Sequence, residues 1–231
     1  MRPRQTLLLG LLLLVPVLAF LFLYGFGSNH YALPTFLPER VDSVRLAGGG
    51  WQRDTVYHRV QLFKLESAAD SAVTNKILKR GLHVIQVLGA VSANDQDAMA
   101  AREMMRIQEK FRREPRVYLV TLVPTASLDA ASQLRKLSEQ YGTISGKWLV
   151  VADAPAGVAH RAQYEFGLTA LRPQHLPFKP ATEPATLPSG RLLLVDKEQH
   201  VRGIYDGTDI HEIERLITEI NVLLHTYDHS H

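Results

Sequence analysis

A polar hexapeptide, Ser-Ala-Asn-Asp-Gln-Asp at residues 92–97, lies between an apolar run and an amphipathic run. Such a junction marks the passage from a β-strand to a helix, where α/β proteins commonly bind their ligands. This hexapeptide contains no cysteine, histidine or lysine. Ser92 and Asp95 suit a helix N-cap and capping box, and Asp95 and Asp97 suit the positive end of the helix dipole. We therefore expect a structural junction, with a hard-metal site on Asp95 and Asp97 as the alternative.

Cysteine is absent from all 231 residues. This excludes disulfides, thiol catalysis, Cys-ligated zinc and iron–sulfur clusters. Histidine can still bind a transition metal: His225, His229 and His231 lie within one short segment at the end of the sequence, and the first two have i,i+4 spacing. Imidazole binds Cu(II), zinc or nickel, so a weak surface metal site competes here with a frayed polar terminus. His175, in a proline-rich segment, is a further candidate ligand.

Other common chemistries have no support in the sequence. We recognise no Ser–His–Asp arrangement, no paired carboxylates and no metallohydrolase motif, and we expect neither enzymatic activity nor a bound cofactor. The segment Ala-Gly-Gly-Gly-Trp at 47–51 lacks the Lys-Ser/Thr of a phosphate loop, which argues against nucleotide binding. The formal net charge of +3 comes from interspersed charges, which argues against nucleic-acid binding.

The N-terminal segment predicts a membrane anchor. Residues 7–26 carry no charge, and a helix of about 20 residues spans the hydrocarbon thickness of about 30 Å. Two arginines lie in residues 1–6 and no charge follows until Glu39. The positive-inside rule therefore places residues 1–6 in the cytoplasm and the rest outside it, in a periplasm-like space. A cleaved signal peptide is the alternative, although the apolar core is long for one and residues 25–27 are a poor cleavage site.

The rest of the chain predicts one α/β domain. We expect a tether over 27–54, a domain over 55–225 and a His-containing tail over 226–231. Continuous or alternating apolar runs predict strands or hairpins at 55–67, 82–91, 116–124, 147–153, 191–196 and 201–207. Amphipathic runs predict helices at 93–112, 130–141 and 157–168, and one from Thr208. This order predicts a thioredoxin-like sandwich, a central mixed sheet with flanking helices, preceded by the transmembrane helix.

Several segments suggest a family. "LLLVDKEQHVRGIYDGTDIHEIERLITEINVLL" (192–224) closely resembles the C-terminal part of the Sco/SenC family, and "YALPTFLP", "DTVYHRVQLFKL" and "EQYGTISGKW" are similar to other family segments. The resemblance implies a membrane-anchored, thioredoxin-fold copper chaperone for cytochrome c oxidase assembly. Such proteins bind copper through a C-x-x-x-C motif after the first central strand and a histidine before the late hairpin. The matching positions in this chain are Ala93, Asp97 and Pro188.

The resemblance thus implies the family fold without its copper and thiol ligands. Soft thiolates select Cu(I), and thiol–disulfide exchange needs thiols. We therefore expect a non-catalytic assembly or interaction protein, acting beside respiratory oxidase subunits or another copper-handling protein. Two alternatives stay open: a copper chaperone whose ligands have moved to the tail histidines or His175, and an unrelated thioredoxin-fold binding module.

Overall fold

The computed structural model divides the chain into two units, Met1–Ala32 and Leu33–His231. The structure describes residues 12, 14–22, 33–45, 49–61, 66–67, 78–89, 95–127, 129–167 and 189–229. In the first unit, residues 14–22 are helical. No helix within the described part of the chain is both long and apolar enough to cross a membrane. Parts of the predicted span 7–26, among them residues 7–11 and 23–26, lie outside that part.

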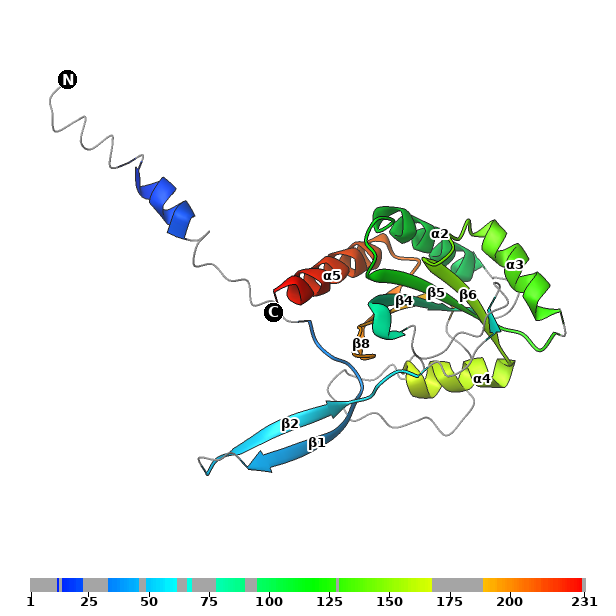
Figure 1. Ribbon diagram of the computed structural model, residues 1–231, viewed down its shortest axis with the longest axis horizontal. Coiled ribbons are helices and arrows are strands. Elements are labelled where there is room, and N and C mark those ends of the chain that lie inside the picture. Colours follow the sequence, from blue (N-terminus) through cyan, green and yellow to red (C-terminus); the bar gives the residue numbers. More distant parts are fainter. Residues whose placement is uncertain are drawn as a thin grey trace, which may run out of the picture. The chain divides into compact units, whose positions relative to one another are not determined.

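The second unit is built on a six-stranded mixed sheet with the strand order β3-β6-β5-β4-β7-β8 (Figure 1). Its parallel centre consists of β4 (Leu82–Val87), β5 (Val117–Pro124) and β6 (Trp148–Asp153). The antiparallel strands are β7 (Arg191–Val195), β8 (Val201–Asp206) and β3 (Glu66–Ser67). All six residues of β4 are buried, as a continuous apolar run covered on both faces requires. The predicted mixed sheet and late hairpin are confirmed.

Helices cover both faces of this sheet (Figure 1). One face carries α2 (Asp95–Lys110), α3 (Ala130–Gln140) and α5 (Ile210–Asp228). The other carries α4 (Pro155–His160), which continues as the π-helical turn η2 (Arg161–Glu165). Alternate residues of β4 enter different cores: Val84 packs with α2 and α5, and Ile85 packs with α4 and η2. The helices predicted around these positions are confirmed, and the architecture is consistent with a thioredoxin-like fold.

The N-terminal part of this unit differs from the prediction. β1 (Pro38–Arg45) and β2 (Trp51–Tyr57) pair in a two-stranded antiparallel sheet, so most of the hairpin lies within the tether predicted for 27–54. The short 3₁₀ turn η1 (Leu78–Arg80) precedes β4. Sequence periodicity missed the hairpin because its strands mix charged and apolar residues on both faces, without the clean alternation of a half-buried strand.

The hairpin joins the main sheet at its base. The amide of Phe36 donates to the carbonyl of Val201 at 2.9 Å, and the amide of Val60 donates to the carbonyl of Gln199 at 2.8 Å. His58 adds a polar contact, because its Nδ1 lies 2.7 Å from Glu39 Oε1 and its Nε2 lies 3.2 Å from Glu165 Oε2. The two ends of the hairpin are thus held against β8 and η2.

Candidate functional site

The junction between β4 and α2 lies at the carboxyl end of the central strand, the edge at which open α/β sheets bind ligands. Asp97 lies in the first turn of α2 and is described by the structure. Ala93 and Pro188, the other two positions matching the family's ligands, lie outside the described residues, as do Ser92 and His175. Of the three positions that match the family's ligands, Asp97 is thus the one that the structure describes.

The Asp97 side chain joins three elements. It is 0% exposed, its Oδ2 accepts a hydrogen bond from the amide of Gly89 at 3.2 Å, and its Oδ1 accepts one from the amide of Gly190 at 2.9 Å. Gly89 follows β4 and Gly190 precedes β7, so the carboxylate ties two strand ends to the start of α2. From the sequence, Asp97 is expected to stabilise the helix dipole, with a hard-metal site as the alternative, and no local pattern indicates these two contacts. Asp95, two residues earlier, is exposed.

Two glycines allow β7 and β8 to approach α2 this closely. Gly190 has a φ of 72°, and a Cβ there would lie 3.2 Å from the Cβ of Gln96. The amide of Gly207 donates to the carbonyl of Gly190 at 2.7 Å. A Cβ on Gly207 would lie 2.6 Å from the Cβ of Ala100, closer than side-chain atoms can pack. The backbone at this end of the sheet therefore lies directly against the first turns of α2.

A buried polar chain continues from Asp97 across the sheet. Gln86 Nε2 donates to the backbone oxygen of Asp97 at 3.0 Å, and Thr121 Oγ1 donates to Gln86 Oε1 at 3.4 Å. Trp148 Nε1 in turn donates to Thr121 Oγ1 at 3.0 Å. These side chains come from β4, β5 and β6. A paired network in a low-dielectric interior fixes one arrangement of its members, because each unpaired group there would be costly.

Tyr141 packs against Trp148 at one end of this network. Its ring stacks on Trp148 with ring centroids 5.6 Å apart, and its buried hydroxyl has no hydrogen-bond partner among the described residues. Burial, together with the negative charge of Asp97, raises the pKa of Tyr141 to about 12. The phenol therefore stays protonated at neutral pH and supplies no phenolate to this junction.

The described part of the junction contains no cluster of metal ligands. Among the described residues, no group of three or more His, Asp or Glu side chains could hold a metal ion. Both oxygens of Asp97 are already bonded to backbone amides. The described part of the junction thus offers hydrogen bonds that stabilise the fold, and no ligand set for chemistry.

The C-terminal histidines are partly brought together. Because α5 runs to Asp228, His225 and His229 lie one turn apart, with exposed rings stacked at a centroid distance of 4.1 Å. His229 Nδ1 donates to the carbonyl oxygen of His225 at 2.8 Å, which leaves its Nε2 as the nitrogen free to bind a metal. His231 lies outside the described residues.

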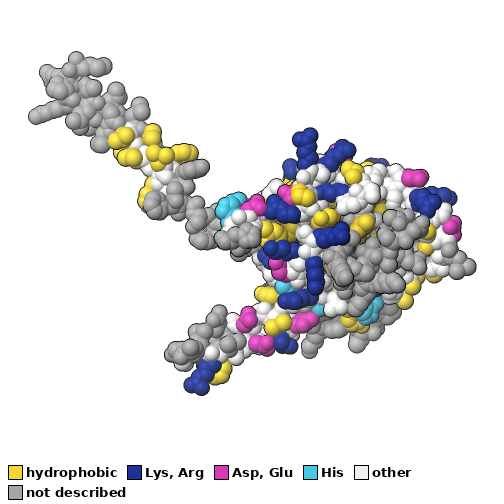
Figure 2. Space-filling model, in the orientation of Figure 1, with side chains coloured by type: hydrophobic (Ala, Val, Ile, Leu, Met, Phe, Trp, Pro, Cys, Tyr) yellow, Lys and Arg dark blue, Asp and Glu magenta, His cyan; other side chains and the backbone are white. Residues whose placement is uncertain are grey.

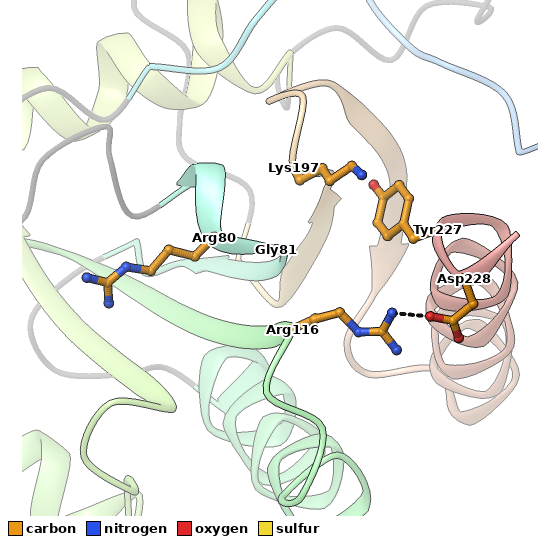
Figure 3. Close-up of a pocket in the computed structure, with 6 residues that line it drawn as sticks. All are labelled: Arg80, Gly81, Arg116, Lys197, Tyr227 and Asp228. Carbon is orange, nitrogen blue, oxygen red and sulfur yellow. Dashed lines mark hydrogen bonds and ion pairs between the residues drawn. The ribbon is translucent and has the colours of Figure 1, made fainter. Parts of the chain in front are cut away.

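A pocket of about 270 Å³ lies at the opposite end of the sheet, beside the amino ends of β4 and β5 (Figure 3). Its lining residues are Arg80, Gly81, Arg116, Lys197, Tyr227 and Asp228. The guanidinium of Arg116 is paired with Glu114 at 2.8 Å and Asp228 at 2.5 Å, and Lys197 Nζ lies 4.1 Å from the centroid of the Tyr227 ring. Figure 3 shows the guanidinium of Arg80 pointing away from these groups. No sequence pattern indicated this pocket, because its walls come from four separate segments.

The chain is similar to known proteins in its three-dimensional structure, but its sequence matches no family model and no curated protein. BsSco, a member of the Sco family of cytochrome c oxidase assembly proteins, is 16% identical with a TM-score of 0.56, covering 73% of this chain and 95% of that chain. A SCO1/SenC family lipoprotein from Bacillus anthracis str. Ames is 14% identical with a TM-score of 0.58, covering 84% of this chain and 99% of that chain. At such identities the likeness establishes a shared fold.

Proposed function

We propose that this chain is a divergent member of the Sco/SenC family that acts as a membrane-anchored, extracytoplasmic, non-catalytic assembly or interaction protein. The shared fold with two proteins of that family supports this proposal. The segment 192–224, which carries the sequence resemblance, forms β7, β8 and most of α5. Fold and sequence therefore point to the same family.

The observation that carries the proposal is the bonding of Asp97. Asp97 matches the second cysteine of the family motif, and the fold brings it to Gly190, two residues after the position that matches the family's histidine. This proximity supports the register of the resemblance. The Asp97 carboxylate is fully buried and accepts hydrogen bonds from the amides of Gly89 and Gly190. These amides would be left unpaired without it, and an unpaired buried amide costs about 1–3 kcal/mol. The position that bears a ligand in the family thus serves the fold in this chain.

The proposed role follows from what this replacement removes. Without any cysteine, the chain supplies no thiolate for Cu(I) and no thiol for disulfide exchange. A protein that keeps the fold without the ligands acts through its surface. BsSco is described as a member of a family of cytochrome c oxidase assembly proteins, so we propose respiratory oxidase subunits or another copper-handling protein as partners.

A copper titration of the full-length chain tests the proposal. The untagged protein in detergent competes for Cu(I) and Cu(II) against chelators of known affinity. We expect no binding tighter than about micromolar, which corresponds to roughly −8 kcal/mol. Tighter binding by the wild-type chain would contradict the loss of the site.

Two variants make this titration decisive. The triple variant Ala93→Cys, Asp97→Cys, Pro188→His restores the ligand types of the family, and we expect it to gain tight Cu(I) binding if the register is correct. A His225→Asn, His229→Asn variant tests relocated ligands. If the wild-type chain binds copper tightly and this variant does not, copper has moved to the C-terminal helix and the chain is a chaperone.

Partner and location need separate measurements. Cross-linking in native membranes followed by purification of the chain should recover oxidase subunits or a copper-handling protein. Protease added to the extracytoplasmic side of right-side-out membranes should digest the domain and leave the N-terminal segment protected. Digestion only after the membrane is opened would contradict the proposed orientation.

A further inference from the structure

The two faces of the β1–β2 hairpin differ in charge. The pairs Arg45↔Trp51, Ser43↔Arg53 and Val41↔Thr55 follow the strand register. Because side chains alternate along a strand, these odd-numbered residues share one face and the even-numbered ones share the other. Within the regular register, residues 40–45 and 51–56, the odd-numbered face carries Arg45, Arg53, Trp51 and Val41 and no acidic residue. The acidic Glu39 lies beyond it, at the register shift between Pro38 and Arg40.

The acidic residues of the two strands lie elsewhere. Asp42 and Asp54 stand directly opposite each other on the even-numbered face, where Arg40 Nε donates to Asp42 Oδ2 at 3.0 Å. Glu39, at the base of β1, lies 2.7 Å from His58 Nδ1. The basic charge of Arg45 and Arg53 is thus not balanced by an acid on their own face.

The odd-numbered face is also apolar and uncovered. Trp51 is 69% exposed and Val41 is 59% exposed, whereas the chain's second tryptophan, Trp148, is 2% exposed. β1 and β2 pair only with each other in the part of the chain that the structure describes. A two-stranded sheet without further packing is marginally stable in water, and Trp51 and Val41 both expose apolar surface on this face.

The positive charge and the amphipathic tryptophan on this face together indicate what kind of surface it binds. We propose that the Trp51–Arg45–Arg53 face docks on an anionic lipid headgroup layer. Tryptophan suits the membrane interface, where its ring is buried and its N–H stays hydrated, and arginine extends its charge toward anionic headgroups. The connecting residues Leu-Ala-Gly-Gly-Gly at 46–50 carry no charge that would oppose contact with lipid. Figure 2 shows basic and hydrophobic side chains together toward the free end of the hairpin, with acidic ones nearer the main body.

The docking proposal rests on the proposed membrane anchor, and the length of chain between the anchor and the hairpin permits the contact. The predicted span and β1 are separated by eleven residues, 27–37. Fully extended they reach up to about 38 Å. The eight residues of β1 add about 26 Å of strand. These lengths set an upper limit of about 64 Å between the predicted span and the end of the hairpin, so the bilayer surface is within reach of this face.

The two tryptophans supply the test. The full-length chain is reconstituted into vesicles of phosphatidylcholine, or of equal parts phosphatidylcholine and phosphatidylglycerol, each with brominated acyl chains that quench tryptophan on contact. Flotation first shows whether the chain is held by the vesicles. The Trp51→Phe variant retains only Trp148, which is buried in the core, and so provides the background.

We expect Trp51 fluorescence to be quenched and shifted to shorter wavelength in the anionic vesicles, with less quenching in the neutral ones. The double variant Arg45→Gln, Arg53→Gln should lose this quenching, and added salt should reduce it. Arg40→Gln, a charge removal on the opposite face of the same strand, should retain it.

Three outcomes would overturn the proposal. A chain that floats with vesicles but shows only the background of the Trp51→Phe variant keeps its anchor and leaves the hairpin face to a protein partner. Equal quenching in neutral and anionic vesicles removes the role of the two arginines. A chain that stays outside the vesicle fraction overturns the anchor together with the docking.

Discussion

The junction at Asp97 and the β1–β2 hairpin place polar side chains in opposite environments. Asp97 is completely buried, and both of its oxygens are bonded to backbone amides. Trp51 on the hairpin is 69% exposed, beside two arginines that face solvent. At the junction the bonding capacity of the side chain is used by the fold itself. On the hairpin the exposed side chains remain available for contacts with a partner. The hairpin is therefore the better candidate for a binding surface, and the junction is the better candidate for a stabilising contact.

Replacing the buried carboxylate of Asp97 should have the largest effect on the free energy of unfolding. Asp97→Ala leaves the amides of Gly89 and Gly190 without their acceptor, and we expect the free energy of unfolding to fall by about 2–4 kcal/mol. Denaturant unfolding of the full-length chain in detergent measures this fall. Asp95→Ala, in the same helical turn but exposed, is the control and should lose only about 0.3–1 kcal/mol of helix-dipole energy. Equal losses in the two variants would show that Asp97 acts as an ordinary helix-end acid.

Breaking the buried hydrogen-bond network of Gln86, Thr121 and Trp148 should have the next largest effect on stability. Thr121→Val removes the acceptor for Trp148 Nε1 and the donor to Gln86, and we expect a loss of about 1–2 kcal/mol. A change in the near-ultraviolet circular dichroism of Trp148 should accompany it. The same substitution in the hairpin, Thr55→Val, should not lower stability, because valine suits a strand at least as well as threonine. A loss at Thr55 as large as that at Thr121 would remove the distinction between the two regions.

The attachment of the hairpin should depend on pH through His58. Its hydrogen bond to Glu165 raises the pKa of His58 above the ordinary value of 6.5, against the opposing effect of burial. Burial opposes the charged form of Glu165, but the hydrogen bonds from His58 and the Gln61 amide lower its pKa. The stabilisation that His58 contributes is therefore complete below pH 6.5 and is lost as the pH rises through its raised pKa.

The variant His58→Gln tests this dependence. We expect the wild-type chain to exceed it in unfolding free energy by up to about 1 kcal/mol below pH 6.5, the range of a solvent-screened ion pair, and the difference should shrink above that pH. Unfolding curves measured at several pH values, on both chains, provide the comparison. A difference that does not change with pH would mean that His58 contributes by packing alone.

The smallest effect is expected at the pocket near the amino ends of β4 and β5. Asp228 pairs with Arg116 at 2.5 Å, but its side chain is 54% exposed and Arg116 keeps its second partner, Glu114. Solvent screens exposed pairs strongly. Asp228→Asn should therefore give an unfolding curve that overlays the wild-type curve at moderate salt. A clear loss would show that this end of the sheet is also stabilised by its charges.

Much of the fold was predictable from local patterns. The continuous apolar run at β4 predicts a buried central strand, and the stripe of apolar residues in α5 predicts an amphipathic helix that packs on a sheet. The turn between β7 and β8 likewise follows from its polar residues between two apolar runs. The hairpin was not predictable in this way, because its strands bury neither face against a core and so lack the periodicity that burial imposes.

The candidate site was predictable only in part. The lack of cysteine and the match of Asp97 to a family ligand position are properties of the sequence, and they exclude thiolate chemistry without any structure. What Asp97 does instead depends on Gly190, which is 93 residues away in the chain. The sequence could identify the position but not the partners that occupy its oxygens.

The absence of thiols, the order of strands and helices from β4 to α5, and the apolar N-terminal segment could all be read from the amino-acid sequence, because each follows from composition or from contacts between near neighbours. Tertiary structure alone decided that Asp97 is a buried tie between β4, β7 and α2, and that Arg45, Arg53 and Trp51 share one open face. Burial and strand register depend on segments that are distant in the chain, and only the folded molecule brings those segments together.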